Sequence, residues 1–512
     1  MLVKTFGSAV HGIDAITITI EVDVTQGMKY FMVGLPDNAV KESQQRIEAA
    51  LKNSGFRMPR MRVVVNMAPA DIKKAGSAYD LPIAIGILAA SGQMSADGLS
   101  QYIIMGELSL DGSLQPIRGA LPIAIQARKE QFKGFILPKQ NAREAAMVNR
   151  LEVYGVSHIR EVVEFLEGKT ALEPLKIDTR EEFFHAQQTF TEDFSDVKGQ
   201  EHIKRAMEIA AAGGHNVILI GPPGAGKTML AKRLPSILPP LTLQEALETT
   251  KIHSVAGKLP ADATLIAHRP FRAPHHTISD TALVGGGSIP QPGEISLAHN
   301  GVLFLDELPE FKRSVLEVLR QPLEERKVTI SRAKIAIEFP ASFMLVASMN
   351  PCPCGYFNHP EKECTCPPGA VQKYLSRISG PLLDRIDLHV EVTPVPFLQL
   401  SSPQEAEKSA VIRQRVIQAR QIQQQRYQSY PGIYCNAQIN STLLKKYCAI
   451  PQAGMQLLKT AMERLHLSAR AYDRILKVAR TIADLEGTEN IQIQHVAEAI
   501  QYRSLDRENW GA

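Results

Sequence analysis

Long apolar runs are missing from this 512-residue sequence. No stretch approaches the roughly 20 uncharged apolar residues that a membrane-spanning helix needs, which argues against an integral membrane protein. The first ten residues carry Lys4 and lead into no sustained apolar run, so we expect no secretory signal peptide. Both observations favour a protein that does not contact a membrane.

The sequence also has few cysteines and a small net charge. Six cysteines in a chain of this length are too few for a disulfide scaffold, so we expect a reduced, cytoplasmic protein. The formal net charge of +4 permits nucleic-acid binding but does not argue for it, since any basic surface would have to be local. With 44% hydrophobic and 21% charged residues the chain is ordinary globular protein, and its length suggests about three domains.

Residues 1–170 are typical of an α/β domain without a nucleotide-binding motif. Residues 16–24 alternate apolar and polar side chains, as a half-buried strand does. An Asp-Gly pair at positions 111 and 112 accepts the positive φ angles of a tight turn, which predicts a hairpin over residues 108–114. A strand over residues 62–67 and helices over residues 39–53 and 81–90 complete the prediction.

Composition and hydrophobic pattern divide the rest of the chain into a linker, an α/β domain and a helical region. Residues 171–191 are polar and aperiodic, which predicts a linker. Residues 192–398 alternate helices with apolar strands that end in phosphate-type motifs, a pattern typical of a mostly parallel sheet. Residues 399–442 are interpreted as a helical linker region and residues 443–512 as a C-terminal helical domain. The helices predicted in this last domain cover residues 455–465, 469–485 and 493–502, the second capped by Ser468.

A phosphate-binding loop of the pattern G-x-x-x-x-G-K-[ST] lies between a predicted strand, residues 217–220, and a predicted helix, residues 229–234. Glycines let backbone N–H groups surround phosphate oxygens, and the helix N-terminus adds partial positive charge. Lys227 would reach the β- and γ-phosphates of ATP, and the Thr228 hydroxyl would bind Mg²⁺. A chance glycine-rich turn is the alternative, which the flanking elements disfavour. The residues expected to bind nucleotide are Gly221, Pro222, Pro223, Gly224, Ala225, Gly226, Lys227 and Thr228.

Polar residues end two further apolar strands. Asp306 and Glu307 follow the strand predicted over residues 302–305; Asp306 would hold Mg²⁺ through water and Glu307 would polarise the attacking water. Acidic strand ends are common, so this motif is strong only together with the phosphate-binding loop. Asn350 follows a strand over residues 343–349 and could orient the attacking water, although it could also be an ordinary loop residue.

Two arginines could act on the γ-phosphate. Arg385 precedes a strand over residues 388–392, where a ring ATPase places the arginine finger that enters a neighbour's site. A salt bridge within the chain, to Asp384 or Asp387, is the alternative. Arg470 begins a helix of the last domain, and for it a γ-phosphate contact and an ordinary surface position are equally open.

Four cysteines form two closely spaced pairs after Asn350. Four thiolates this close in a reduced protein suggest tetrahedral Zn²⁺, although zinc fingers usually have two or more residues between paired cysteines. His359 lies inside the loop and is a possible substitute ligand, while reduced thiols without metal are the alternative. Because the loop follows Asn350 directly, a metal there could couple the loop to the nucleotide. The cysteines are Cys352, Cys354, Cys364 and Cys366.

The residues in these motifs resemble the Walker A, Walker B, sensor 1, arginine finger and sensor 2 set of AAA+ ATPases. Residues 196–200 resemble the segment that lies near the adenine. Three phrases narrow the resemblance to magnesium-chelatase-like ATPases of the YifB/ComM type: RPFRAPHHT (269–277), PGEISLAHN (292–300) and SGPLLDRID (379–387). The resemblance covers nearly the whole chain and implies an α/β P-loop AAA+ core with a C-terminal helical lid.

The N-terminal domain of that family resembles the proteolytic domain of Lon, an α/β fold of the ribosomal S5 domain 2 type. Ser77 stands where Lon has its nucleophilic serine. Leu121 stands at the position of the lysine base, and leucine cannot take a proton from the serine. We therefore expect a domain that is not a protease, in which Ser77 is a turn residue.

The resemblance also implies a function. ComM-type proteins are understood as hexameric DNA helicases that drive branch migration and help donor DNA integrate during natural transformation. ATP, Mg²⁺, single-stranded or branched DNA and a homo-hexamer would then be the cofactors and partners. The rivals are a chelatase-like motor that remodels a protein partner or supports metal insertion into a tetrapyrrole, and a Lon-like unfoldase or protease.

Three local features bear on DNA. Residues 328–339 predict a hairpin with Arg332 and Lys334 near its tip; related helicases place such a hairpin in the ring's pore, although it could be a solvated tip. The Gly/Pro-rich residues 283–293 suit a mobile pore loop or a passive connection. Residues 408–430 lack acidic side chains and could track DNA phosphates or form a solvated helix face. The basic residues there are Lys408, Arg413, Arg415, Arg420 and Arg426.

Overall fold

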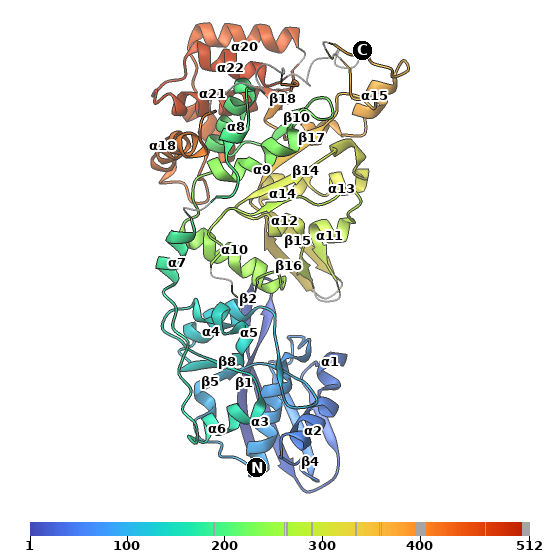
Figure 1. The fold of residues 1–512 in the computed structure, drawn as a ribbon, viewed down its shortest axis with the longest axis vertical. Helices are drawn as coiled ribbons and strands as arrows, with labels where there is room; N and C mark the ends of the chain where they lie inside the picture. The colour runs from blue at the N-terminus through green and yellow to red at the C-terminus, as the bar shows by residue number, and fades with distance from the viewer. Residues whose placement is uncertain are drawn as a thin grey trace.

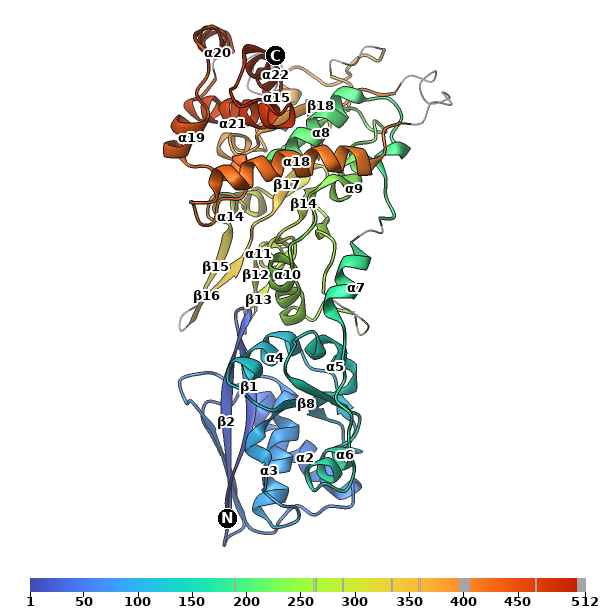
Figure 2. The same ribbon diagram turned by 90° about the vertical axis from the view of Figure 1, so that its left-hand side faces the viewer.

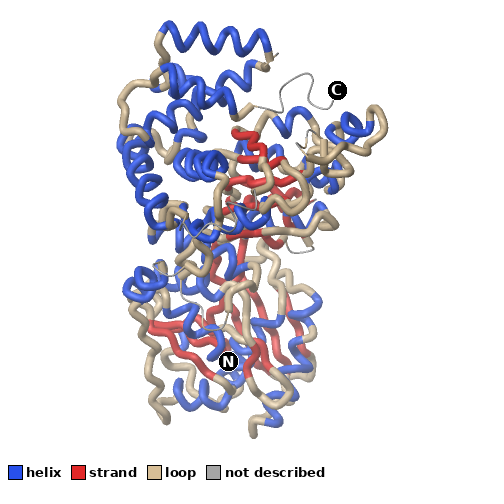
Figure 3. The backbone as a smooth tube through the Cα atoms, turned by 45° about the horizontal axis from the view of Figure 1, so that its top comes forward, coloured by secondary structure: helices blue, strands red, loops and turns tan. Residues whose placement is uncertain are grey.

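The computed structural model is elongated, with the N-terminal domain at one end, a helical region at the other and an α/β layer between them (Figure 1). Figure 3 shows strands both in the N-terminal domain and in the α/β layer, with helices around them. The structure describes residues 1–187, 190–260, 262, 265–287, 290–332, 335–357, 359, 361–395, 406–465 and 467–503. In these ranges no helix is both long and apolar enough to cross a membrane.

The N-terminal domain is built on a seven-stranded mixed sheet in the order β3-β4-β2-β1-β5-β8-β9. β1 and β2 form a long antiparallel hairpin, and Ile18, Ile20 and Val22 of β2 are fully buried. This alternation confirms the half-buried strand predicted over residues 16–24. The strands are β1 (Leu2–His11), β2 (Asp14–Thr25), β3 (Tyr30–Val33), β4 (Arg62–Ala68), β5 (Tyr102–Ile104), β8 (Gly134–Pro138) and β9 (Glu152–Val156).

The helices of this domain include one, α3 (Asp80–Ala90), whose residues are all buried. Its charged residue, Asp80, pairs with Arg46 at 2.7 Å, which compensates the burial of the carboxylate. The helix predicted over residues 39–53 is divided at Glu42, because Gln45 N donates to Glu42 O in a tightened turn. The predicted hairpin is confirmed as β6 (Glu107–Leu108) and β7 (Leu114–Gln115). The other helices are α1 (Asn38–Lys41), α2 (Ser43–Asn53), α4 (Ala120–Lys129), α5 (Lys139–Ala146) and α6 (Ile159–Leu166).

The segment predicted as a linker, residues 171–191, contains a helix, α7 (Thr179–Ala186). The Asp178 side chain caps it, and Phe183 is fully buried in the core of the N-terminal domain. One buried aromatic side chain in two helical turns gives too little periodicity to be recognised in the sequence. The N-terminal domain therefore holds the chain as far as α7.

The central domain contains a five-stranded sheet in the order β11-β14-β17-β10-β18, with every neighbouring pair parallel. The three strands at its centre are buried on both faces, which explains why they read as continuous apolar runs. The strands are β10 (Val217–Ile220), β11 (Phe271–Arg272), β14 (Val302–Leu305), β17 (Met344–Met349) and β18 (Leu388–Glu391). The helices of eight or more residues are α8 (Glu201–Gly213), α9 (Lys227–Ile237) and α10 (Leu243–Val255); the shorter ones are α11 (Asp280–Val284), α12 (Glu294–Leu297), α13 (Arg313–Glu317), α14 (Arg320–Glu325), α15 (Ala370–Leu375) and α16 (Gly380–Leu383).

The C-terminal region is helical, as predicted, and its core is continuous with that of the central domain. Leu230 of α9 and Val416 of α18 belong to the same buried cluster as Ile475 of α21. Ser468 caps α21 by accepting from Ala471 N at 3.2 Å, which confirms the predicted N-cap. The helices are α18 (Ser409–Tyr427), α19 (Ser441–Tyr447), α20 (Gln452–Arg464), α21 (Ala469–Leu485) and α22 (Ile493–Gln501).

The N-terminal domain contacts the central domain mainly through α10. Leu241 and Ala246 belong to the N-terminal core, and the Ser254 hydroxyl donates to the buried carboxylate of Glu144. A second contact lies at the tip of the β1–β2 hairpin, where a Cβ at Gly12 would be 3.4 Å from Cγ2 of Ile337. Figure 2 shows this tip beside the β15–β16 hairpin (Lys327–Arg332 and Ile335–Pro340).

Candidate nucleotide site

The phosphate-binding loop joins β10 to α9 at the carboxyl edge of the central sheet. Gly226, with φ of +87°, turns the chain into the helix in a conformation that favours glycine. A Cβ at Gly221 would lie 2.2 Å from the carbonyl oxygen of Val392, so the loop can pass β18 only without a side chain there. The loop that the sequence predicts thus has the tight backbone path that phosphate binding needs.

Lys227 is half-buried and turned back on the loop. Its Nζ donates to the carbonyl oxygens of Gly221 and Pro222 at 2.7 and 2.9 Å, and to Asn350 Oδ1 at 3.1 Å. Burial lowers the pKa of Lys227, and the carboxylates of Asp306 and Glu307 oppose that shift. A phosphate oxygen could replace the two carbonyl acceptors, and Asn350 already contacts the same ammonium group.

Asp306 connects the loop with two strand ends. Thr228 Oγ1 donates to its Oδ2 at 2.9 Å, and Ser348 Oγ donates to its Oδ1. Hydroxyl and carboxylate oxygens side by side are the hard ligands that Mg²⁺ prefers, so this donor set fits the ion. The sequence reasoning missed Ser348, although a hydroxyl in the apolar run of β17, two residues before Asn350, could have indicated it.

Glu307 follows Asp306 in a left-handed conformation, with φ of +54°. Its side chain is 57% exposed, and Oε2 lies 3.7 Å from Nδ1 of His276. A non-glycine residue in this backbone region is uncommon and often marks a functional site. His276 was not singled out as a site residue, although it lies in the phrase at residues 269–277.

These residues share one cavity of about 440 Å³. It opens at the carboxyl ends of β10, β14 and β17, the edge where open parallel sheets bind their ligands. The predicted Walker A, Walker B and sensor 1 residues are thus brought together, apart from Gly221 and Pro222, which do not line it. The described lining is Pro223, Gly224, Ala225, Gly226, Lys227, Thr228, Met229, Asp306, Glu307, Ser348, Met349 and Asn350.

The two predicted arginines lie outside this cavity. Arg385 is buried and donates to the Glu324 carboxylate and to Pro381 O, so it has an internal partner, but not the Asp384 or Asp387 expected as the alternative. The Arg470 side chain is 62% exposed and lies 3.2 Å from Asp384. Neither arginine lines the cavity of its own chain, and roles in an assembled ring stay predictions.

The four cysteines of the predicted zinc site converge. Their Sγ atoms all lie within 4.8 Å of one another. His359 is not among them, and its Nδ1 accepts from the backbone N–H groups of Glu361 and Lys362 at 3.1 Å, so the imidazole has a structural partner instead. The grouping is the one that tetrahedral Zn²⁺ requires.

The structure describes most of the two segments that were predicted to line a DNA-binding pore. The hairpin over residues 328–339 is present as β15–β16, with Arg332 at the end of β15, while Lys334 lies outside the described residues. The Gly/Pro-rich segment forms a small antiparallel pair, β12 (Gly285–Gly286) with β13 (Gln291–Pro292). Pore positions for either segment stay predictions.

The four arginines of the basic stretch in α18 all have partners within the chain. Arg415 pairs with Glu208 and Glu407, and Arg420 donates to Ala211 O at 3.1 Å. The remaining pairs are Arg426 with Asp484 and Arg413 over the ring of Phe190. Arg415 and Arg426 hold α18 against acidic side chains of α8 and α21, so the stretch is not simply a solvated helix face. Contact between this stretch and DNA stays a prediction.

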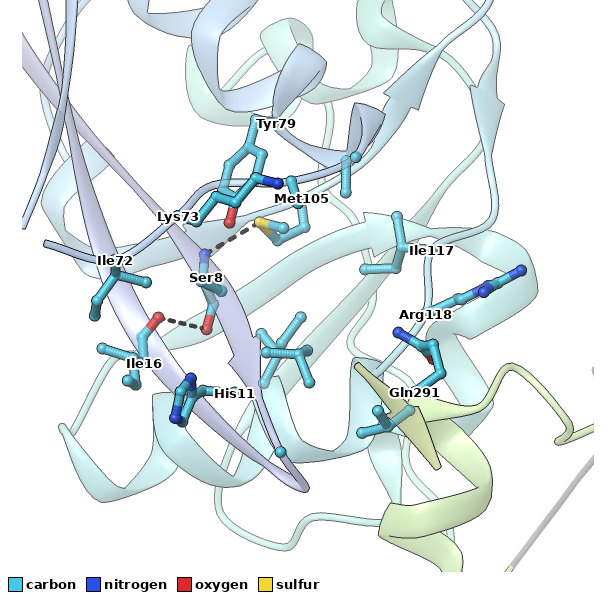
Figure 4. Close-up of a pocket in the computed structure, with 18 of the residues that line it drawn as sticks. Ser8, His11, Ile16, Ile72, Lys73, Tyr79, Met105, Ile117, Arg118 and Gln291 are labelled. Atoms are coloured by element: carbon cyan, nitrogen blue, oxygen red, sulfur yellow. Dashed lines mark hydrogen bonds between the residues drawn. The ribbon is translucent and has the colours of Figure 1, made fainter. Parts of the chain in front are cut away.

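A second cavity, of about 820 Å³, lies where the N-terminal domain meets the β13 and β16 strands. Its wall combines Ser8, Tyr79 and Arg118 of the N-terminal domain with Gln291 of β13 (Figure 4). Ser77 also lines it, and its hydroxyl donates to the Glu107 carboxylate. Leu121 is fully buried and can supply no base.

We expect Ser77 to remain unlabelled by a fluorophosphonate serine-hydrolase probe. Its hydroxyl has a carboxylate partner, and Leu121 cannot accept the proton that a nucleophilic serine must lose. Intact-mass spectrometry of the purified protein measures the outcome, with an active serine protease as the positive control. Labelling that disappears in Ser77→Ala would contradict the prediction.

Comparison with known proteins identifies the family. Three family models match the chain: "Magnesium chelatase, subunit ChlI" over residues 193–400, "Subunit ChlI of Mg-chelatase" over residues 20–141, and "Magnesium chelatase, subunit ChlI C-terminal" over residues 406–503. Proteins named YifB and ComM are 45% and 46% identical to this chain over almost its full length. The chain belongs to the YifB/ComM family of magnesium-chelatase-like AAA+ ATPases. Family membership implies ATP and Mg²⁺ as cofactors, in agreement with the α/β P-loop core.

Relatives within this family match along almost their entire length. The competence protein ComM of Haemophilus influenzae is 46% identical over 513 residues, covering 99% of this chain and 98% of that protein. The uncharacterized protein YifB of Salmonella typhimurium is 45% identical over 504 residues, covering 98% and 96%. Outside this family the similarity is partial: Lon protease 2 of Bacillus subtilis is 34% identical over 154 residues, covering 27% of this chain and 26% of that protein.

Proposed function

We propose that this chain is the subunit of a cytoplasmic AAA+ ring motor, a DNA helicase that promotes branch migration in natural transformation and recombination. ATPase activity is supported above all by five polar residues that line one cavity: Lys227, Thr228, Asp306, Glu307 and Asn350. The full-length similarity to a competence protein supports the DNA part.

The geometry suggests how the chain would hydrolyse ATP. Lys227 would leave the carbonyls of Gly221 and Pro222 for the β- and γ-phosphates. Thr228 and Asp306 would hold Mg²⁺, which neutralises phosphate charge when bound. Glu307 would orient and polarise the attacking water, and Asn350 would link that position to Lys227.

A ring would complete this site. No arginine lines the described cavity, whereas phosphoryl transfer in such ATPases gains a large factor from an arginine supplied by a neighbour. We therefore propose a homo-hexamer in which Arg385, Arg470 or both approach the adjacent subunit's γ-phosphate. For Arg385 this requires its bond to Glu324 to open on assembly.

The other parts of the chain take supporting roles in this proposal. The β15–β16 hairpin, with Arg332 and Lys334, would grip DNA phosphates in the pore. The C-terminal helices α19–α22 would form the lid of the core. The N-terminal domain would be Lon-like, for which the partial match to Lon protease 2 is support, and would lack protease activity because Leu121 cannot act as a base. The four-cysteine cluster would bind Zn²⁺.

A chelatase-like motor that remodels a protein partner is the second candidate. The three matching family models all describe the chelatase subunit ChlI, and the arginines of α18 are occupied within the chain. Both observations fit a motor without DNA.

Steady-state ATP hydrolysis with and without single-stranded and forked DNA tests the proposal. We expect DNA to stimulate hydrolysis, salt to weaken the stimulation, and Arg332→Ala/Lys334→Ala to remove it while basal hydrolysis persists, because phosphate contacts are screened by salt. Glu307→Gln is the inactive control. Robust hydrolysis that is indifferent to DNA would contradict the helicase and favour the protein-remodelling motor.

A further inference from the structure

We infer that the four-cysteine zinc site clamps the phosphate-binding loop, so that nucleotide affinity depends on the metal. The clamp presupposes the proposed ATP and zinc sites but no activity on DNA. Two independent contacts, one through Asn350 and one through Gly355, connect the cysteines to the loop.

The spacing of the thiols is compatible with a tetrahedral zinc site. The Sγ atom of Cys352 lies 3.3 Å from that of Cys354 and 3.8 Å from that of Cys364, and Cys354 and Cys364 are 3.5 Å apart. A tetrahedral zinc with Zn–S bonds of about 2.3 Å separates its sulfurs by about 3.8 Å. Phe357 N also donates to Cys352 Sγ at 3.3 Å, the kind of second-layer bond that orients a thiolate ligand. Four protein thiolates would fill the coordination sphere, so the site is structural.

The first contact runs along the chain. Cys352 is fully buried and stands two residues after Asn350, whose side chain accepts from Lys227 at 3.1 Å. Fixing the Cys352 sulfur therefore also fixes the backbone that presents Asn350 to the loop lysine.

The second contact is direct packing. Gly355 follows Cys354, has φ of +87°, and is so close to the loop that a Cβ there would lie 2.6 Å from Cδ of Pro223. Pro223 itself lines the nucleotide cavity. The turn is closed by a bond from Gly355 N to Cys352 O at 3.0 Å. A metal that joins Cys352 and Cys354 to the distant pair would hold this turn against the phosphate-binding loop.

Zinc binding and nucleotide binding should strengthen each other. Without zinc, the cysteine turn would have to become ordered when nucleotide binds, so the affinity for nucleotide falls. Coupling between two binding sites typically changes affinity by about 5–150-fold. We expect roughly a tenfold increase in the Kd for ATP on zinc removal, and by linkage nucleotide must tighten zinc binding by the same factor.

The experiment uses the full chain with Glu307→Gln to prevent hydrolysis, and no DNA. Zinc content is measured by elemental analysis, and Kd with a fluorescent ATP analogue before and after chelation. Gly355→Ala tests the packing contact while it leaves all four thiols in place. Gly369→Ala is the matched control, because Gly369 has a similar φ of +78° but no atom within 4 Å of its Cβ position.

Four results would support the clamp. The chain should hold one zinc, and both chelation and Gly355→Ala should raise the Kd for ATP. Gly369→Ala should leave that Kd unchanged, and nucleotide should slow the loss of zinc to a chelator. Equal nucleotide affinity with and without zinc would overturn it, and so would protein that binds no zinc under reducing conditions. Cys366→Ser adds a second route to the metal-free state, and chelation of the native chain covers the case in which that variant does not fold. A chain that binds nucleotide but ignores DNA would refute the helicase and leave the clamp intact.

Discussion

Glu307→Gln should lower the turnover number for ATP hydrolysis by roughly 10²–10⁴-fold, the usual contribution of a positioned general base. Nucleotide binding should persist, because the proposed contacts of Lys227 with the phosphates and of Thr228 with Mg²⁺ do not involve the Glu307 carboxylate. The side chain lines the cavity, is largely exposed and makes no bond to the loop in the described structure, so its loss should not disturb the fold. Steady-state phosphate release and equilibrium binding of an ATP analogue measure the two effects separately.

Glu325→Gln is the matched control for this prediction. Glu325 ends α14, is exposed, and accepts a hydrogen bond from Gln321 on the surface. Both variants remove one negative charge, but Glu325 does not line the cavity. If Glu307→Gln hydrolysed ATP at more than about a tenth of the rate of Glu325→Gln, the loss would be smaller than a general base usually contributes. Another group would then polarise the water, and His276 would be the next candidate.

Phe183→Ala should destabilise the N-terminal domain by about 3–5 kcal/mol, the usual loss when a fully buried phenylalanine is truncated. Phe183 is fully buried in the N-terminal core, although it lies in a segment whose sequence predicts a linker. The cavity left behind should release α7, so its backbone amides should exchange with solvent much faster. Urea unfolding and hydrogen-exchange mass spectrometry measure these two results.

The neighbouring Phe184 provides the control, since 54% of it is exposed. Phe184→Ala removes the same number of atoms from the same helix and should change stability by less than about 0.5 kcal/mol, as surface substitutions do. Equal effects of the two substitutions would mean that α7 does not dock through Phe183. The prediction concerns folding alone, so ATP hydrolysis by the central domain is not its measure.

The core of the nucleotide site could be predicted because its motifs are local. Lys227 and Thr228 stand within a single short pattern, and Asp306, Glu307 and Asn350 each follow an apolar strand that is buried on both faces. Parallel strands place such residues on one edge whatever the length of the connections between them. The positions of these residues relative to one another therefore follow from the fold class.

Other partnerships depend on residues that are distant in sequence. Arg385 pairs with Glu324, and Arg426 pairs with Asp484. A basic stretch without local acids suggests a free surface, but its acidic partners come from other helices once the chain has folded. Sequence reasoning considered phosphate contacts for these arginines and left a salt bridge or a solvated helix face open, because their counter-charges lie far away in the sequence.

The sequence by itself determined the family, the α/β class, the phosphate-binding loop and the strand ends that carry the acidic and amide side chains. Hydrophobic periodicity and short motifs contain that information, since each depends on neighbours within a few residues. Only the tertiary structure decided that Ser348 and His276 join the site, that α7 belongs to the N-terminal core, and that Gly355 packs on Pro223. These contacts arise from packing between separate segments, which close-packed interiors fix and local sequence does not encode.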